Sequence, residues 1–146
     1  MALHNLHTDE TFSAVYWERG EYLKDALAEV DRVLRDYRTG DVHPIDRSLL
    51  DLLDDLSVKT ETSAPFQVIS AYRSPLTNRR MHEKSSGVAR NSLHMEGRAL
   101  DIRSERLSLP ALQRAAIGLG RGGVGYYPRS EFVHVDVGAV RTWQGV

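Results

Sequence analysis

The stretch Arg98-Ala-Leu-Asp-Ile-Arg103 alternates polar and apolar side chains, which is typical of a β-strand with one polar side. Leu100 and Ile102 fall on one face of this predicted strand, and Asp101 falls on the other. A carboxylate among apolar residues is costly to bury unless a cation pairs with it, and a metal ion or an arginine would serve. The stretch therefore predicts a sheet that carries a charged group in need of a partner.

The rest of the chain predicts helices as well as strands. Apolar residues recur at three- and four-residue spacing in residues 22–37 and again in 45–56, as in amphipathic helices. The predicted helices cover residues 22–37, 45–56, 76–84 and 109–117, and the predicted strands cover 11–17, 66–72, 98–103 and 132–137. Glycine-rich turns are expected before the last strand. This order of elements favours an α+β fold with a small, mainly antiparallel sheet flanked by helices.

Length and composition set limits on the class of protein. The chain has 146 residues with a net charge of −1, and 41% of its residues are hydrophobic. These values predict one globular domain over residues 1–146, with no nucleic acid as partner and no membrane span. The N-terminal stretch MALHNLHTDETF lacks the pattern of a secretory signal. Either the protein is cytoplasmic or a signal has been removed.

Cysteine is absent, so a metal ion would have to be bound by His, Asp or Glu side chains. Gly97 argues against one continuous helix from His94 to Asp101, and a loop that turns back can place both side chains on one side of a sheet. If the strand that contains His134 is a neighbour, three side chains converge. Two imidazoles and one carboxylate suit Zn²⁺ at a catalytic site. Spacing alone leaves a metal site and ordinary structural residues as equal alternatives. The remaining histidines are interpreted as structural: His4, His7, His43 and His82.

The pattern Ser92-x-His94-x-x-Gly97-x-Ala99-x-Asp101 resembles the first zinc motif of the D-alanyl-D-alanine metallopeptidases, a group with VanX dipeptidases, zinc D,D-carboxypeptidases and several murein endopeptidases. The greater similarity is to the murein endopeptidase K-like branch, and it extends over nearly the whole chain. It is carried by LHT (6–8), LRDYRTG (34–40), ISAYRSP (69–75), SLHMEGRALDIR (92–103), GGVGYYP (122–128), FVHVDVG (132–138) and the following Arg141-x-Trp143. The resemblance implies a fold like that of Hedgehog and the D-alanyl-D-alanine peptidases.

The resemblance also implies roles for individual residues. The family's zinc ligands match His94, Asp101 and His134, and one Zn²⁺ per chain is expected. Arg73 matches a substrate-facing arginine that would stabilise an oxyanion or bind a substrate carboxylate, with a structural ion pair as the alternative. Ser92 and Tyr126 are expected to contact the substrate, although Ser92 could equally be a turn residue.

Two carboxylates are candidates for the general base. Glu131 lies three residues before His134, which resembles the Glu-x-x-His arrangement of the dipeptidases, and it could pass a proton from water to the leaving amine. It could equally be an exposed residue in the turn before the strand. Asp136 lies two residues after His134 and therefore on the same face, where it could act as the base or orient the imidazole ring.

The resemblance implies a zinc metallopeptidase that hydrolyses amide bonds in the stem peptides or cross-links of peptidoglycan. A murein endopeptidase acting on cross-links is the first choice. A D-alanyl-D-alanine carboxypeptidase or dipeptidase is the second, and a non-catalytic zinc-pocket module that binds the cell wall is a third. The partner would be peptidoglycan or a muropeptide. Because this substrate lies outside the cytoplasmic membrane, the protein would be periplasmic or exported, with its signal removed from this chain.

Two further patterns are interpreted as ordinary surface features. Residues 120–125 fit G-x-G-x-x-G, but a predicted helix precedes them and Tyr-Tyr-Pro follows, which is the wrong context for a dinucleotide site. We therefore interpret them as turn glycines. A modest basic patch is interpreted as a solvated face, with contact to acidic cell-wall groups as the alternative, and it contains Arg79, Arg80, Lys84 and Arg90.

Overall fold

The computed structural model describes all 146 residues. Its strands are β1 (Ala2–Asn5), β2 (Thr11–Ser13), β3 (Trp17–Glu18), β4 (Glu21–Tyr22), β5 (Phe66–Ser70), β6 (Ala99–Arg103), β7 (Gly123–Tyr127), β8 (Phe132–Asp136) and β9 (Arg141–Gln144). Its helices are α1 (Lys24–Val33), α2 (Arg47–Lys59), α3 (Pro75–Lys84) and α4 (Leu109–Leu119), with a short 3₁₀ helix η1 (Leu93–Glu96). Seven strands form one sheet in the order β2-β1-β5-β6-β8-β7-β9, and β3 pairs with β4 in a separate ribbon.

The sheet is mixed, so the prediction of a mainly antiparallel sheet is correct only in part. β1 pairs with β5 in parallel, β9 pairs with β7 in parallel, and the other neighbours are antiparallel. The sequence did not predict β1, β7 or β9. β1 and β9 are short, and the glycines of β7 suggested turns. One of them, Gly125, is required inside a strand because the indole ring of Trp143 occupies the space where a side chain would be.

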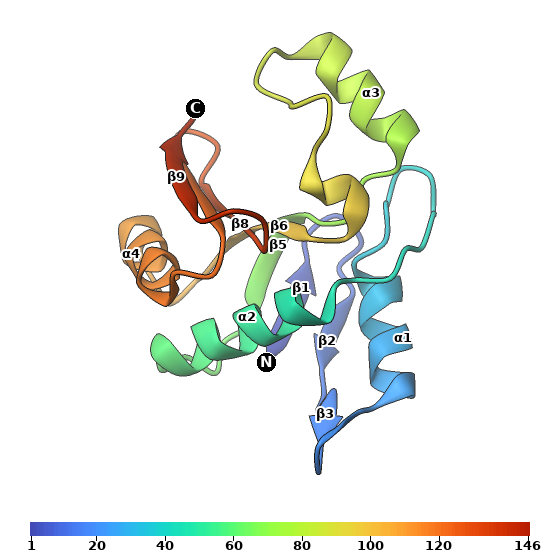
Figure 1. Ribbon diagram of the computed structural model, residues 1–146, viewed down its shortest axis with the longest axis vertical. Coiled ribbons are helices and arrows are strands. Elements are labelled where there is room, and N and C mark those ends of the chain that lie inside the picture. Colours follow the sequence, from blue (N-terminus) through green and yellow to red (C-terminus); the bar gives the residue numbers. More distant parts are fainter.

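One face of the sheet is buried against helices and the other carries the polar residues. The alternating side chains Leu100, Ile102, Val133 and Val135 of β6 and β8 belong to the apolar core, together with the buried leucines of α2. Figure 1 shows α1 beside β2 on one side of the sheet, α4 beside β8 on the other and α2 between them, while α3 stands apart at the top of the view. No helix is both long and apolar enough to span a membrane.

The start of α3 is fixed by a serine cap that directly follows Arg73. Ser74 accepts a hydrogen bond from the backbone N–H of Thr77, and Pro75 occupies the first turn, where no N–H is needed. The backbone N–H of Ser74 donates to Asp36, whose side chain is 1% exposed. Asp36 lies just after α1, which ends at Val33 rather than at residue 37 as predicted. The chain turns there so that Asp36 points inward and supports the segment that contains Arg73.

Replacement of Asp36 by asparagine is expected to destabilise the protein by about 2 kcal/mol at neutral pH, because hydrogen bonds to a buried charge are lost. Burial alone would raise the pKa of Asp36, but hydrogen bonds from Thr77, Ser74 and Arg38 lower it below the ordinary value. Its contribution is therefore present above about pH 4 and is lost as the pH falls through the lowered pKa. Urea unfolding of wild type and Asp36→Asn, both treated with a chelator, measures the difference in their free energies of unfolding. This difference should become smaller toward acid pH. A difference that stays constant with pH would show that the Asp36 charge does not stabilise the fold.

Candidate active site

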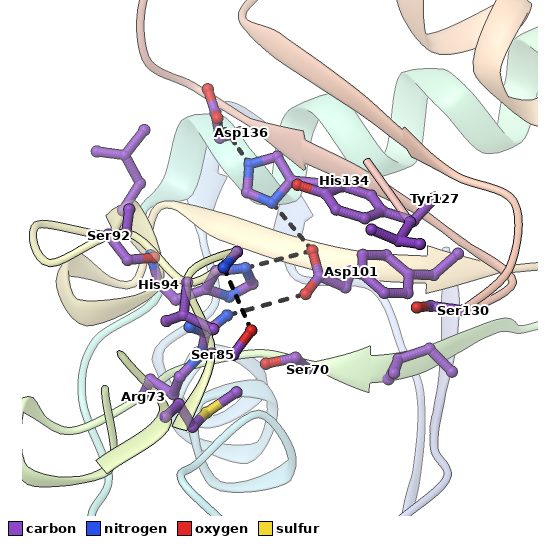
Figure 2. A pocket seen from close by; sticks show the side chains of 18 of the residues that line it. Ser70, Arg73, Ser85, Ser92, His94, Asp101, Tyr127, Ser130, His134 and Asp136 are labelled. Carbon is purple, nitrogen blue, oxygen red and sulfur yellow. Dashed lines mark hydrogen bonds and ion pairs between the residues drawn. The ribbon is translucent and has the colours of Figure 1, made fainter. Parts of the chain in front are cut away.

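The sheet register brings two of the predicted ligands together. Asp101 on β6 and His134 on β8 are directly opposite each other, so both side chains leave the same face. His94 comes from η1, which ends at Gly97 with a φ of 67° and so lets the chain turn back into β6. One potential ligand atom from each of the three side chains lies within 4.8 Å of the others. Figure 2 shows both imidazoles directed at the Asp101 carboxylate.

Each imidazole is oriented by a partner on its far side. His94 Nδ1 lies 2.8 Å from the carbonyl oxygen of Ala71, so this nitrogen carries the proton and donates it. His94 Nε2 is then unprotonated, and it is buried without a hydrogen-bond partner. His134 Nε2 lies 2.8 Å from Asp136 Oδ2, which leaves its Nδ1 facing Asp101 Oδ1 at 2.9 Å. Metal-binding histidines are typically held in this way by an acceptor on the second nitrogen.

A bound cation would satisfy the His94 nitrogen that lacks a hydrogen bond, and it would separate the lone pairs of His134 and Asp101 that face each other. With Nε2 donating to Asp136, a neutral His134 presents a lone pair at Nδ1 to the Asp101 carboxylate, and these repel unless a proton or a metal ion lies between them. The donor set has two nitrogens and a carboxylate, which fits zinc. The residues present therefore fit a divalent metal ion with His94, Asp101 and His134 as ligands.

The protonation states of Asp101 and His94 agree with this donor set, whereas His134 would have to release a proton to bind a metal ion. Burial alone would raise the pKa of Asp101, but the adjacent His94 and His134 hold it well below its usual range. Burial lowers the pKa of His94, so this imidazole is neutral at pH 7. Burial also acts to lower the pKa of His134, but the carboxylates of Asp101 and Asp136 raise it above the ordinary value. An ionised carboxylate and a neutral imidazole are the forms that bind metal.

Asp136 is fully buried and all its hydrogen-bonding positions are used. Oδ1 accepts hydrogen bonds of 2.9 Å from the backbone N–H groups of Gly123 and Gly138. Oδ2 accepts from Arg141 at 2.8 Å in addition to His134. Burial acts to raise the pKa of Asp136, but these donors hold it well below its usual range. A carboxylate so engaged is suited to orient His134 and not to take up a proton.

The cluster lies in a cavity of about 630 Å³. Arg73 is 7% exposed, and its guanidinium Nη2 lies 3.9 Å from Asp101 Oδ2. Figure 2 shows Arg73 approaching Asp101 from the side opposite His134. The wall beyond His134 is aromatic: the Trp143 ring is centred 5.1 Å from the His134 ring, and its Nε1 donates to the Tyr127 hydroxyl at 2.7 Å. A polypeptide would meet a cationic side and an aromatic side around the three predicted ligands.

The comparisons with known proteins identify the family. A family described as "Peptidoglycan L,D-endopeptidase MepK" matches residues 1–143 of the chain. The chain belongs to this family. It is therefore a peptide hydrolase, and the resemblance to the D-alanyl-D-alanine metallopeptidases, with its murein endopeptidase K-like branch, is confirmed. The non-catalytic module considered as an alternative is not supported.

Individual relatives are similar over almost all of the chain. The chain is 41% identical over 143 residues to Peptidoglycan L,D-endopeptidase MepK of Escherichia coli K12, which covers 98% of this chain and 79% of the relative. It has the same identity and coverage with the protein of that name from Shigella flexneri. It is 37% identical over 147 residues to Probable peptidoglycan L,D-endopeptidase MepK of Haemophilus influenzae, covering 100% of this chain and 79% of the relative. No solved structure matches the chain.

Two residues assigned to the site of this peptidase lie elsewhere. Tyr126 packs against the core, whereas its neighbour Tyr127 lines the cavity, because the two tyrosines lie on opposite faces of β7. Glu131 is not among the residues that line the cavity. Its side chain is 75% exposed and lies 3.8 Å from Arg103, and its φ of 61° belongs to the turn before β8. Tyr127 and not Tyr126 therefore lines the cavity, and Glu131 lies outside its lining.

Ser92 lines the cavity and also caps η1. Its hydroxyl accepts a hydrogen bond of 3.2 Å from the backbone N–H of His94. Of the two roles predicted for Ser92, this contact favours positioning of the loop that contains His94. Trp143 and Asn78 were not predicted as functional residues. The Arg-x-Trp pattern pointed to Trp143 without giving it a role, and no signal pointed to Asn78.

Replacement of Asp136 by asparagine is expected to weaken metal binding by about 10- to 100-fold, since an amide lacks the charge that holds His134. A competition titration with a chromophoric zinc chelator would measure the change. Asp9→Asn is the matched control, because Asp9 forms a 2.7 Å pair with His4 at the surface, away from the cluster. Equal zinc affinities of wild type and Asp136→Asn would show that Asp136 does not support the ligand.

Proposed function

We propose that the protein is a zinc-dependent murein endopeptidase that hydrolyses an amide bond in peptidoglycan cross-links. The observation that carries the proposal is the His94–Asp101–His134 cluster, with an unpartnered, buried His94 Nε2 that faces Asp101 beneath an open cavity. The relatives named L,D-endopeptidases support the choice of bond, which would join an L-centre to a D-centre.

His94, Asp101 and His134 would hold one Zn²⁺ per chain. When bound, such an ion lowers the pKa of a ligated water and polarises the scissile carbonyl. The chain's own contribution is to present the three donors without reorganisation. The Ala71 carbonyl and Asp136 fix the two imidazoles, and the sheet register fixes Asp101 opposite His134.

Arg73 supplies positive charge where the reacting carbonyl would lie. Its guanidinium is almost completely buried, and its Nη2 faces the Asp101 carboxylate at 3.9 Å without a hydrogen bond. Hydrolysis of an amide places negative charge on the carbonyl oxygen, and a fixed cationic donor stabilises that charge strongly in a site shielded from water. The same group could instead hold a carboxylate of the substrate.

The charge of the cavity supports an anionic peptide as substrate. Arg38 lines the cavity beside Arg73, and its guanidinium rests 4.3 Å from the centre of the Tyr37 ring. The only acidic side chains that line the cavity are Asp101 and Asp136, and both are engaged. Stem peptides that carry free carboxylates would meet this excess of positive charge. We propose an exported location, because peptidoglycan lies outside the cytoplasmic membrane.

The decisive experiment is digestion of purified sacculi with zinc-loaded protein, followed by chromatography and mass spectrometry of the muropeptides. The proposal predicts that cross-linked dimers fall and monomers rise, that a chelator stops the reaction, and that added Zn²⁺ restores it. Release of D-alanine without loss of dimers would instead identify a carboxypeptidase. Absence of any chelator-sensitive product would refute the proposal.

Replacement of Glu131 by glutamine is expected to leave kcat within about twofold of wild type. The carboxylate is exposed and outside the cavity, and surface changes away from a site have small effects. The measurement is the rate of cleavage of a purified cross-linked muropeptide dimer. A loss of about 100-fold or more, the typical effect of removing a general base, would restore Glu131 as the catalytic carboxylate.

A further inference from the structure

Asn78 is buried in the first part of α3, where it is 1% exposed, and its amide joins two parts of the site. Its Oδ1 accepts a hydrogen bond of 3.0 Å from the Arg73 guanidinium. Its Nδ2 donates to the backbone carbonyls of Ala89 and Arg90, at 3.0 and 3.1 Å. One oxygen and one nitrogen of a single side chain thus connect the cationic group to the segment that follows α3.

That segment, residues 85–91, forms a rim of the cavity, and we call it the rim loop. Ser85, Gly87, Val88, Ala89 and Asn91 all line the cavity. In Figure 1, α3 and the chain that follows it stand away from the other helices, so few elements are available to hold the loop. Besides Asn78, His82 contacts the loop, through a 2.6 Å interaction of Nδ1 with the Val88 carbonyl. Asn78 differs from His82 because it also contacts Arg73.

The chemistry of these contacts selects an asparagine. A guanidinium has only donors, and a backbone carbonyl has only acceptor positions, so the residue between them must both accept and donate. Aspartate would accept from Arg73 but could not donate to the loop. The opposite orientation of the amide would place its NH₂ against the guanidinium and its oxygen against two carbonyls. All the hydrogen-bonding groups of Asn78 are therefore satisfied in one orientation only.

We propose that Asn78 is a positioning residue, which holds the Arg73 guanidinium in place for the reaction and joins it to the backbone of the rim loop. The inference rests on the proposed role of Arg73 in the reaction. Arg73 has no other side-chain hydrogen bond, since Nη2 lies 3.9 Å from Asp101 and Nε is unpartnered. Loss of Asn78 would leave the guanidinium buried but free to change its direction.

The test is a double-mutant cycle on zinc-loaded protein, with a purified cross-linked muropeptide dimer as substrate. Asn78→Ala is expected to lower kcat about tenfold or more, because a hydrogen bond to a charged group is lost, while zinc content is unchanged. In the Arg73→Ala background the same change should have no further effect on kcat. Because Asn78 is buried, Asn78→Ser is made in parallel, and the cycle uses whichever variant keeps the wild-type circular dichroism spectrum.

His82→Ala is the matched control, since it loosens the rim loop without contact to Arg73. It is expected to raise KM and to leave kcat within about twofold, as expected for a residue outside the reacting groups. If His82→Ala lowers kcat as much as Asn78→Ala, or if the Asn78 effect persists without Arg73, Asn78 does not act through Arg73. A wild-type kcat for Arg73→Ala would instead refute the proposed role of Arg73 itself.

Discussion

Replacement of His94 by alanine is expected to abolish zinc binding and to lower kcat/KM by at least about a thousandfold, which corresponds to roughly 4 kcal/mol of transition-state stabilisation. His94 supplies the one ligand nitrogen that makes no hydrogen bond within the protein, and this nitrogen lies 3.3 Å from Asp101 Oδ1. Its loss leaves two ligands, and structural and catalytic zinc sites use at least three from the protein. Elemental analysis of dialysed protein should find about one Zn²⁺ per chain in wild type and a small fraction of that in the variant.

The control for this change is His4→Ala, which removes an imidazole that pairs with Asp9 outside the cluster. It should retain both zinc and activity. Circular dichroism separates loss of the metal from loss of the fold, because His94 belongs to η1 and its Nδ1 donates a hydrogen bond to the Ala71 carbonyl. A His94→Ala variant that binds zinc with wild-type stoichiometry would remove His94 from the ligand set.

Replacement of Arg73 by alanine is expected to lower kcat by about 100- to 1,000-fold while the zinc content stays at the wild-type level. This is the typical effect of removing a donor to a developing oxyanion. The guanidinium points toward the Asp101 carboxylate but does not belong to the donor set of the cluster. The rate of cleavage of the muropeptide dimer at saturating substrate gives kcat, and elemental analysis gives the metal content of the same samples.

Arg73→Lys distinguishes charge from geometry. Lysine keeps the charge but lacks the planar group that can hold Asn78 and a substrate oxygen at the same time. Partial recovery of kcat by lysine would indicate that charge supplies part of the effect. An unchanged kcat in Arg73→Ala, with KM raised, would assign Arg73 to binding of a substrate carboxylate and not to the reacting oxygen.

Much of the cluster was predictable because its residues follow local rules. The alternation around Asp101 predicted its face on β6, Gly97 indicated the turn after His94, and the two-residue spacing put Asp136 on the face of His134. The alternation of side chains between the two faces of a strand follows from the local backbone alone and does not depend on the rest of the chain. The α+β class was predicted for a similar reason, since helix periodicity and strand alternation are both local patterns.

The remaining features depend on contacts between distant parts of the chain. β7 was interpreted as turns because of its glycines. One of them, Gly125, makes room for Trp143, which lies 18 positions later in the chain, and no local sequence pattern predicts such a contact. Because β7 was not predicted as a strand, the sequence did not indicate which of its side chains face the cavity. Tyr126 was therefore predicted to contact the substrate, whereas Tyr127 lines the cavity. Parallel pairing of β1 with β5 joins residues more than 60 positions apart. The role proposed for Asn78 depends on its contacts with Arg73 and residues 89–90, and these contacts exist only in the folded chain.

The pairing of β6 with β8 has a consequence for how this enzyme folds. Because side chains alternate along both strands, a slip of β6 by one residue against β8 would turn Asp101 toward the helices and expose Leu100, while His134 would keep its face. The same hydrogen-bond ladder therefore decides whether the apolar core closes and whether the ligands meet. A chain with the wrong strand register would therefore lack both the closed apolar core and the assembled ligands. If the cluster binds a metal ion as proposed, metal uptake during refolding would report the correct pairing of β6 with β8.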